Sequence, residues 1–195
     1  MIHIRNASIL GLCLFTLNAF AAESPELGAH IASQAAADAL RSHVNSDGAF
    51  LAAGLVKQNF QADRLESILQ YPTDEVVVLN LTGAQIRKAF ERSLSLYPQP
   101  NTSFLQISGF EVTYNKSGLP NQRVVSVTAG GSELQDGKTY SVAMPSSLGR
   151  GGLGYFKIWD KSNIDQARTP AGVTVESVLR GKSVSQSSPR WVAQG

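Results

Sequence analysis

The chain has 195 residues, of which 43% are hydrophobic and 16% charged, so it can bury the core of one domain and does not have the composition of a disordered chain. Its formal net charge is +2, from 17 Lys and Arg against 15 Asp and Glu. We expect no nucleic acid as partner, because the sequence lacks the clustered Lys and Arg that contact phosphate backbones.

Residues 1–21 have the three-part layout of a secretory signal peptide. Arg5 precedes an apolar run over 7–17, and Ala19-Phe20-Ala21 has the small-x-small pattern that signal peptidase recognises. The run is too short for a stable transmembrane helix, so we expect no stable membrane insertion. We predict cleavage near Ala21, a periplasmic or secreted location, and a single domain over 22–195. A lipid anchor at Cys13 is the alternative, although bulky Leu12 precedes this cysteine, the only one in the chain.

The first half of the domain alternates between helix and strand. Apolar residues at helical spacing predict a helix over 29–42, and a cluster of Asn, Ser, Asp and Gly over 45–48 predicts a turn. A short helix is expected over 63–69, and the β-branched run over 75–81 predicts a strand.

The next helix has a clear starting signal. Thr82 followed three residues later by Gln85 predicts a capping box, in which each side chain hydrogen-bonds the other residue's backbone N–H. We expect this helix to continue to about Leu96, because Pro98 and Pro100 follow.

The second half is rich in strands separated by glycine-containing turns. We expect one or two strands over 104–114 with a kink at 108–109, and then further elements: strands over 123–128, 132–134 and 139–144, a glycine-rich loop over 148–155 and a short helix over 174–179. The prediction is therefore one α+β domain, with a mixed or antiparallel sheet and packed helices.

The histidines and one glycine-rich motif do not indicate a catalytic or nucleotide-binding site. The sequence has three histidines, and His30 and His43 lie outside any His- or carboxylate-rich cluster, so we expect no two-metal hydrolytic site. Residues 149–154 match G-x-G-x-x-G, but an aromatic, extended segment follows instead of a helix, so we interpret the match as accidental. The loop could still line a pocket. We expect no catalytic residue, no metal ligand and no cofactor.

Several stretches in chain order resemble the C-terminal domain of the 5′-nucleotidases. The resemblance extends from about Glu23 to Trp191. It rests on the opening segments E-S-P-E-L-G and D-A-L-R, on V-V-V-L-N-L-T-G-A-Q-I, on F-L-Q-I-S-G and on G-G-L-G-Y, at residues 23–28, 38–41, 76–86, 104–109 and 151–155. In the family, a separate metallophosphatase domain holds two metal ions and hydrolyses the substrate. The resembling domain binds the nucleoside between aromatic rings and the phosphate through arginine.

The resemblance implies a set of binding residues. Phe104 falls on the first stacking ring, and Gln106 stands where a polar side chain contacts the base. Asn45 opens the segment that corresponds to the family's N-G-G-x-x-R, and Tyr155 or Phe156 could supply a replacement ring from the glycine-rich loop. Phe104 also has an ordinary interpretation as a core residue, since an aromatic side chain at the start of an apolar strand is usually buried.

The sequence departs from the family pattern at several binding positions. Phe50 replaces the arginine expected at the phosphate, Ser147 replaces the second stacking ring, and Leu153 replaces the aspartate of G-G-D-G-Y. The family's P-F-G-N segment corresponds to Gln70-Tyr71-Pro72-Thr73. Losing the arginine removes a bidentate phosphate contact that phenylalanine cannot replace.

Two hypotheses remain from the sequence. In the first, the chain is an exported nucleoside- or nucleotide-binding domain linked to nucleotide catabolism. It does not hydrolyse alone and acts with a separate metallophosphatase, because the residues before Glu23 are interpreted as a signal. In the second, the domain has lost nucleotide binding and serves as an exported interaction or structural module.

Overall fold

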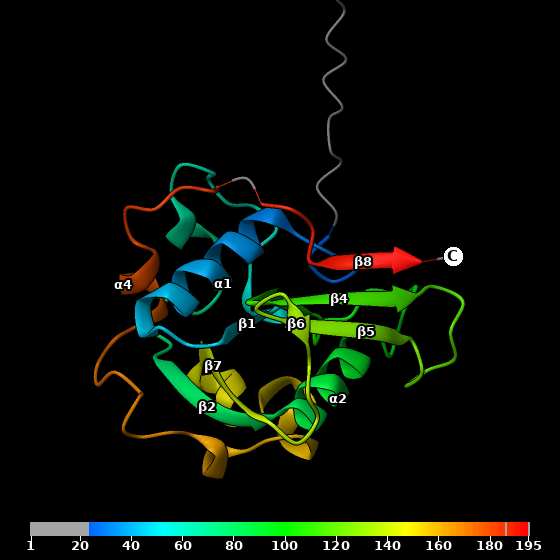
Figure 1. The fold of residues 1–195 in the computed structure, drawn as a ribbon. Coiled ribbons are helices and arrows are strands. Elements are labelled where there is room, and N and C mark those ends of the chain that lie inside the picture. The colour runs from blue at the N-terminus through cyan, green and yellow to red at the C-terminus, as the bar shows by residue number, and fades with distance from the viewer. Residues whose placement is uncertain (1–23, 186, 195) are drawn as a thin grey trace, which may run out of the picture.

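The computed structural model describes residues 24–185 and 187–194 (Figure 1). The predicted signal peptide, its cleavage site and Cys13 lie outside these residues. Among the helices of the described part, none is long and apolar enough to cross a membrane.

The described residues form two four-stranded sheets, and the first has the order β2-β7-β1-β3. Its strands are β1 (Gly48–Ala52), β2 (Val76–Thr82), β3 (Leu105–Ser108) and β7 (Thr139–Pro145). The β2–β7 and β1–β3 pairs are antiparallel, whereas β1 and β7 run parallel. The sheet is therefore mixed, as the α+β prediction expected.

The second sheet has the order β6-β5-β4-β8. It consists of β4 (Phe110–Asn115), β5 (Val124–Ala129), β6 (Ser132–Glu133) and β8 (Trp191–Gln194). β8, near the C-terminus, runs parallel to β4 at one edge of the sheet (Figure 1).

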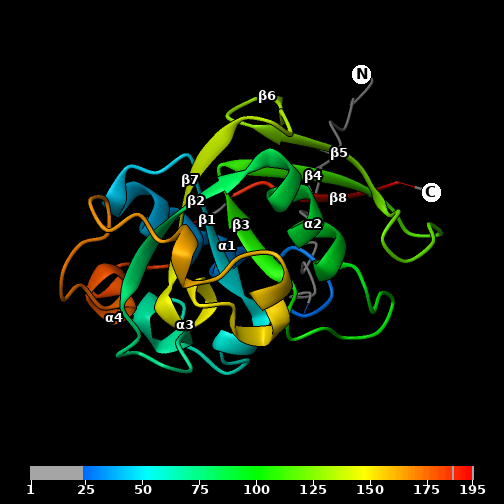
Figure 2. The ribbon, with the colours of Figure 1, turned by 90° about the horizontal axis from the view of Figure 1, so that it is seen from below.

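In the described part of the chain, four α-helices pack around the sheets. They are α1 (Ile31–Val44), α2 (Gly83–Ser93), α3 (Ser146–Gly149) and α4 (Val175–Leu179). α1 packs on β1, β3 and β7, and α2 contacts both β2 and β5, so it bridges the two sheets. In Figure 2, α3 and α4 lie on the side of β2, whereas α2 lies beside the second sheet.

One part of the hydrophobic core is a cluster of aromatic side chains. Phe50 of β1 is fully buried and contacts the rings of Phe90, Phe110 and Trp159 at centroid distances of 5.7, 5.7 and 6.1 Å. Phe90 in turn contacts Trp191 of β8 at 5.5 Å. One aromatic cluster thus joins α2 and strands of both sheets.

The capping-box prediction is confirmed. The Thr82 hydroxyl accepts a hydrogen bond from the Gln85 N–H at 3.2 Å, and Oε1 of Gln85 accepts one from the Thr82 N–H at 3.0 Å. The residue after Thr82 is a glycine, and a Cβ at this position would lie only 2.2 Å from the carbonyl oxygen of Gln135. The turn before β7 is held close to the start of α2 by backbone hydrogen bonds from the Gly83 and Ala84 N–H groups to the carbonyls of Lys138 and Asp136, at 2.9 and 3.1 Å.

Several boundaries differ from the sequence-based prediction. The segment predicted as one or two strands over 104–114 forms two strands in different sheets. They are joined by Gly109, whose φ is +78° and whose added Cβ would lie 2.1 Å from the Asp47 carbonyl oxygen. The predicted turn over 45–48 runs directly into β1, which the sequence did not predict, and β8 was also missed. The short helix expected over 63–69 is a 3-10 helix, η2, over Leu65–Ile68.

Candidate functional site

Phe104 lies in the interior, directly before β3. Its side chain is only 1% exposed, and its ring packs against the Trp191 ring at a centroid distance of 4.6 Å. The Trp191 indole N–H donates to the carbonyl of Leu105 at 2.8 Å, which fixes the second ring in place. In this conformation Phe104 offers no free face on which a base could stack.

Gln106 is fully buried and binds the segment before α1. Its amide donates to the carbonyls of Pro25 and Gly28 at 2.9 and 2.7 Å, and its Oε1 accepts from the His30 N–H at 2.9 Å. Each polar atom of the side chain therefore has a backbone partner. This arrangement holds the first described residues against β3.

Tyr155 is also buried. Its ring stacks on Trp159 at 4.5 Å with an interplanar angle of 11°, and its hydroxyl donates to the Ser103 carbonyl at 2.6 Å. Burial raises the pKa of the Tyr155 hydroxyl, although a hydrogen bond with Ser93 and the nearby charge of Arg92 act in the opposite direction. The hydroxyl is thus a neutral donor inside the fold.

Asn45 lies apart from these three residues, at the C-terminal cap of α1. It adopts a left-handed conformation with φ of 49°, and its carbonyl accepts from Arg168 at 2.8 Å. The ligand-binding roles of Phe104, Gln106, Tyr155 and Asn45 stay predictions, and none of the four lines the pocket described next.

An open pocket of about 450 Å³ lies between the segment before β2 and the segment after β7. It brings together Ser147 and Leu153, two positions at which the sequence departs from the family's binding pattern. Its lining consists of Leu55, Tyr71, Thr73, Asp74, Ser147, Leu148, Gly152 and Leu153. We call this cavity the Asp74 pocket.

Strand pairing determines which residues meet in the Asp74 pocket. β2 and β7 pair so that Val76 lies opposite Pro145, which places Asp74 next to the start of α3. The Asp74 carboxylate accepts hydrogen bonds from the Ser146 hydroxyl at 2.7 Å, the Ser147 hydroxyl at 2.5 Å and the Ser147 N–H at 3.2 Å. These bonds hold the carboxylate at one wall of the pocket.

The glycine-rich loop contributes another part of the pocket lining. It folds into 3-10 turns, η3 (Gly152–Lys157), with Leu153 and Gly154 at φ of 53° and 79°. The Leu153 carbonyl accepts from the Ser103 hydroxyl at 2.9 Å and from Arg92 at 2.5 Å. The loop thus has fixed internal partners, and its residues Gly152 and Leu153 line the pocket.

Tyr71 is the aromatic side chain that the pocket offers to solvent. It is 56% exposed, in contrast to the buried rings of Phe104 and Tyr155. The residue-by-residue prediction did not select it as a site residue. The sequence did contain a signal for Tyr71, because this residue lies in the segment that corresponds to the family's P-F-G-N.

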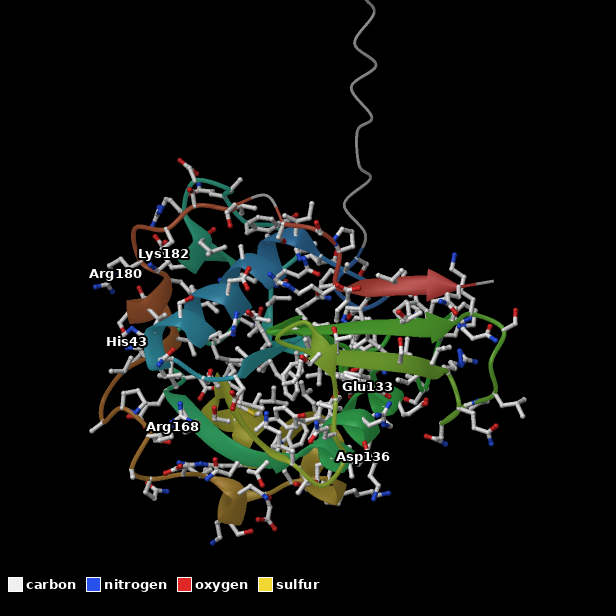
Figure 3. The ribbon with its side chains drawn as sticks, viewed as in Figure 1. His43, Glu133, Asp136, Arg168, Arg180 and Lys182 are labelled. Atoms are coloured by element: carbon white, nitrogen blue, oxygen red, sulfur yellow. The ribbon has the colours of Figure 1, made fainter. Side chains whose placement is uncertain are left out.

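A larger groove of about 650 Å³ lies between α1 and the segment that contains α4. Figure 3 shows His43, Arg180 and Lys182, which line it, along one edge of the molecule. The groove shares no lining residue with the Asp74 pocket. Arg180 pairs with Glu176 at 3.1 Å, and Asp38 pairs with Arg190 at 2.7 Å, so two of its charged residues already have partners.

Comparison with known proteins identifies the family. The model of the family described as "5′-nucleotidase, C-terminal domain" matches residues 16–160. The chain belongs to this family. No group of three or more His, Cys, Asp or Glu that could hold a metal ion occurs within 24–185 and 187–194.

The relatives of this 5′-nucleotidase C-terminal domain are longer proteins. The snake venom 5′-nucleotidase of Naja atra is 38% identical over 95 residues, which are 44% of this chain and 18% of the relative. A 5′-nucleotidase-related protein of Glossina morsitans morsitans is 35% identical over 125 residues, 57% of this chain and 22% of the relative. The chain therefore spans about a fifth of the length of these curated relatives.

The fold agrees with this assignment. The crystal structure of a 5′-nucleotidase precursor from Thermus thermophilus superimposes with a TM-score of 0.72 at 18% identity, covering 86% of this chain and 36% of that one. The prediction of a 5′-nucleotidase C-terminal-like α+β domain is confirmed.

The lining of the Asp74 pocket contains little charge. Phe50, at the position of the expected arginine, is fully buried in the aromatic core and brings no charge to the pocket. Of the described residues that line the pocket, Asp74 alone is a charged type. The site thus combines an exposed aromatic ring, three leucines and one hydrogen-bonded carboxylate.

Proposed function

We propose that the chain is an exported nucleoside- or nucleotide-binding domain that takes its ligand in the Asp74 pocket. In this proposal it does not hydrolyse nucleotides alone and acts with a separate metallophosphatase protein in nucleotide catabolism. Membership of the 5′-nucleotidase C-terminal family supports the link to nucleotide catabolism. The signal-like pattern over 1–21 and the venom origin of the Naja atra relative support export.

The observation that carries the proposal is the presence of Tyr71 and Asp74 at one pocket with Ser147 and Leu153. An exposed aromatic ring can stack on a base, which contributes about 1–3 kcal/mol per base. The pocket volume of about 450 Å³ lies within the usual range of small-molecule sites. Tyr71 would therefore replace Phe104 as the stacking ring.

The second candidate function is an exported interaction or structural module without a ligand. The internal contacts of Phe104, Gln106 and Tyr155 favour it, because these residues would be retained for stability alone. The two candidates differ in whether the Asp74 pocket binds anything.

Thermal unfolding with adenosine, AMP or UDP-glucose distinguishes the two. A ligand present at 100 times its Kd stabilises the folded protein by about 2.7 kcal/mol, which raises Tm measurably. We expect stabilisation in the parent protein and its loss in Tyr71→Ala. Phe156→Ala is the matched control, since Phe156 is 64% exposed but does not line the pocket. No shift with any of these probes at millimolar concentration would favour the structural module.

The non-catalytic part of the proposal has its own test. Purified protein with Mn²⁺, Co²⁺ or Zn²⁺ should release no phosphate from AMP. Metal-dependent release that a chelator abolishes, and that persists at constant specific activity through further purification, would contradict it.

A further inference from the structure

We propose that the Asp74 pocket selects an uncharged nucleoside and rejects the corresponding nucleoside 5′-phosphate. This inference rests on the proposed function and narrows its ligand class. It follows from the position of Asp74, from the donors that its carboxylate already occupies, and from the chemistry of the other lining residues.

The carboxylate of Asp74 uses the hydrogen-bond donors at this wall of the pocket. The Ser146 hydroxyl, the Ser147 hydroxyl and the Ser147 N–H all point to its two oxygens, at 2.7, 2.5 and 3.2 Å. A phosphate oxygen that came to the same place would have to compete with a covalently attached anion for these donors. Asp74 thus takes the place at which an anionic ligand group would be held.

The remaining lining offers a phosphate no compensation. Apart from Asp74, the lining side chains of the described chain are aromatic, aliphatic or hydroxylic. The arginine expected from the family pattern is Phe50, which is fully buried. A phosphate monoester carries about 1.5 to 2 negative charges at neutral pH, and like charges that share a site disfavour each other.

A neutral nucleoside meets none of these costs. Its base can stack on the Tyr71 ring and contact Leu55, Leu148 and Leu153, which line the same cavity. A carboxylate has about four lone-pair positions, and three donor groups of Ser146 and Ser147 occupy the Asp74 carboxylate. The Ser147 N–H is shared between the two carboxylate oxygens, at 3.2 and 3.3 Å, so a ribose hydroxyl can donate to the carboxylate by replacing the longer of these two contacts.

Calorimetric titration of the purified chain with adenosine and with AMP tests the inference. We expect adenosine to bind at least about tenfold more tightly than AMP, because like charges a few ångströms apart repel even in water. In Asp74→Asn, which keeps the size of the side chain, the ratio of the adenosine affinity to the AMP affinity should fall towards one because AMP binds more tightly. Glu133→Gln is the charge-matched control and should keep the parent ratio, since Glu133 is exposed on β6 in the second sheet (Figure 3).

Salt provides a measurement that does not depend on how well the variant folds. In the parent protein, raising the ionic strength should bring the ratio of the adenosine affinity to the AMP affinity closer to one. The reason is that screening weakens the repulsion between partly exposed charges. Equal or tighter binding of AMP than of adenosine would overturn the inference and leave the proposed function standing. Binding of neither would overturn both. A preference for adenosine that neither salt nor Asp74→Asn changes would show that Asp74 is not its cause.

Discussion

Two aromatic regions of this domain have opposite roles. Phe104 and its partner Trp191 lie in the interior, where their rings contact each other at 4.6 Å. Tyr71 lies at the Asp74 pocket and is 56% exposed. Both regions fall on segments that correspond in chain order to binding segments of the family, yet only the second presents a ring to solvent.

The two regions differ in whether the polar residue beside the aromatic ring is buried or borders a cavity. Beside Phe104, Gln106 uses its amide to bind the carbonyls of Pro25 and Gly28 and the N–H of His30. Beside Tyr71, Asp74 is held by serine donors but remains at the wall of an open cavity. Similarity to a binding segment therefore does not by itself make a residue accessible to a ligand.

The largest expected effect is that of Phe104→Ala on stability. Removing a buried phenylalanine leaves a cavity and should lower the free energy of unfolding by about 3–5 kcal/mol. Urea denaturation followed by fluorescence measures this, and Phe156→Ala provides the exposed counterpart. A loss below about 1 kcal/mol would show that Phe104 is not the core residue described here.

Gln106→Met should have the next largest effect. The substitution keeps the length of the side chain but leaves the His30 N–H and the Pro25 and Gly28 carbonyls without their partner, at about 1–3 kcal/mol for each group that stays buried. We expect a total loss of about 2–4 kcal/mol, because part of the segment can rearrange towards water. Gln122→Met, at an exposed position, is the control in the same urea experiment.

A smaller effect is expected from pH at His30. Burial lowers the pKa of this imidazole, so between its lowered value and the ordinary value of about 6.5 the unfolded chain binds a proton that the folded chain does not. The free energy of unfolding should therefore decrease as pH falls below neutrality. In His30→Asn this part of the pH dependence should disappear, as measured by urea titrations at several pH values. An unchanged slope would place its origin elsewhere.

The smallest effect on stability is expected for Tyr71→Ala. Because the ring is mostly exposed, its loss should change the free energy of unfolding by no more than about 0.5 kcal/mol. The same variant should lose ligand-dependent stabilisation, which is the reverse of the pattern expected for Phe104→Ala. A large loss of stability in Tyr71→Ala would remove the contrast between the two regions.

Local signals in the sequence predicted much of the fold. The capping box of Thr82 and Gln85 depends on residues three apart, and α2 begins where they predict. The strand expected over 75–81 and the helices expected over 29–42 and 174–179 also correspond to observed elements, because their patterns extend over several neighbouring residues. β8 was missed since its four residues form a strand only through parallel pairing with β4, about 80 positions earlier.

The candidate site was predictable only in part. The positions of Ser147 and Leu153 followed from the family resemblance, and both line the Asp74 pocket. The choice of Phe104 and Tyr155 as binding rings followed from the same resemblance, whereas burial gives both rings internal partners. Tyr71 lies in the segment that corresponds to P-F-G-N, but no local pattern marked Asp74, and the meeting of both residues with Ser147 depends on the pairing of β2 with β7.

The amino-acid sequence by itself determined the family, the α+β class and the main helices and strands, since these follow from motifs and periodicity along the chain. Only the tertiary structure decided which aromatic rings are covered and which carboxylate borders a cavity. The physical reason is that burial and charge environment arise from contacts between distant segments, such as Phe104 with Trp191 and Asp74 with Ser147.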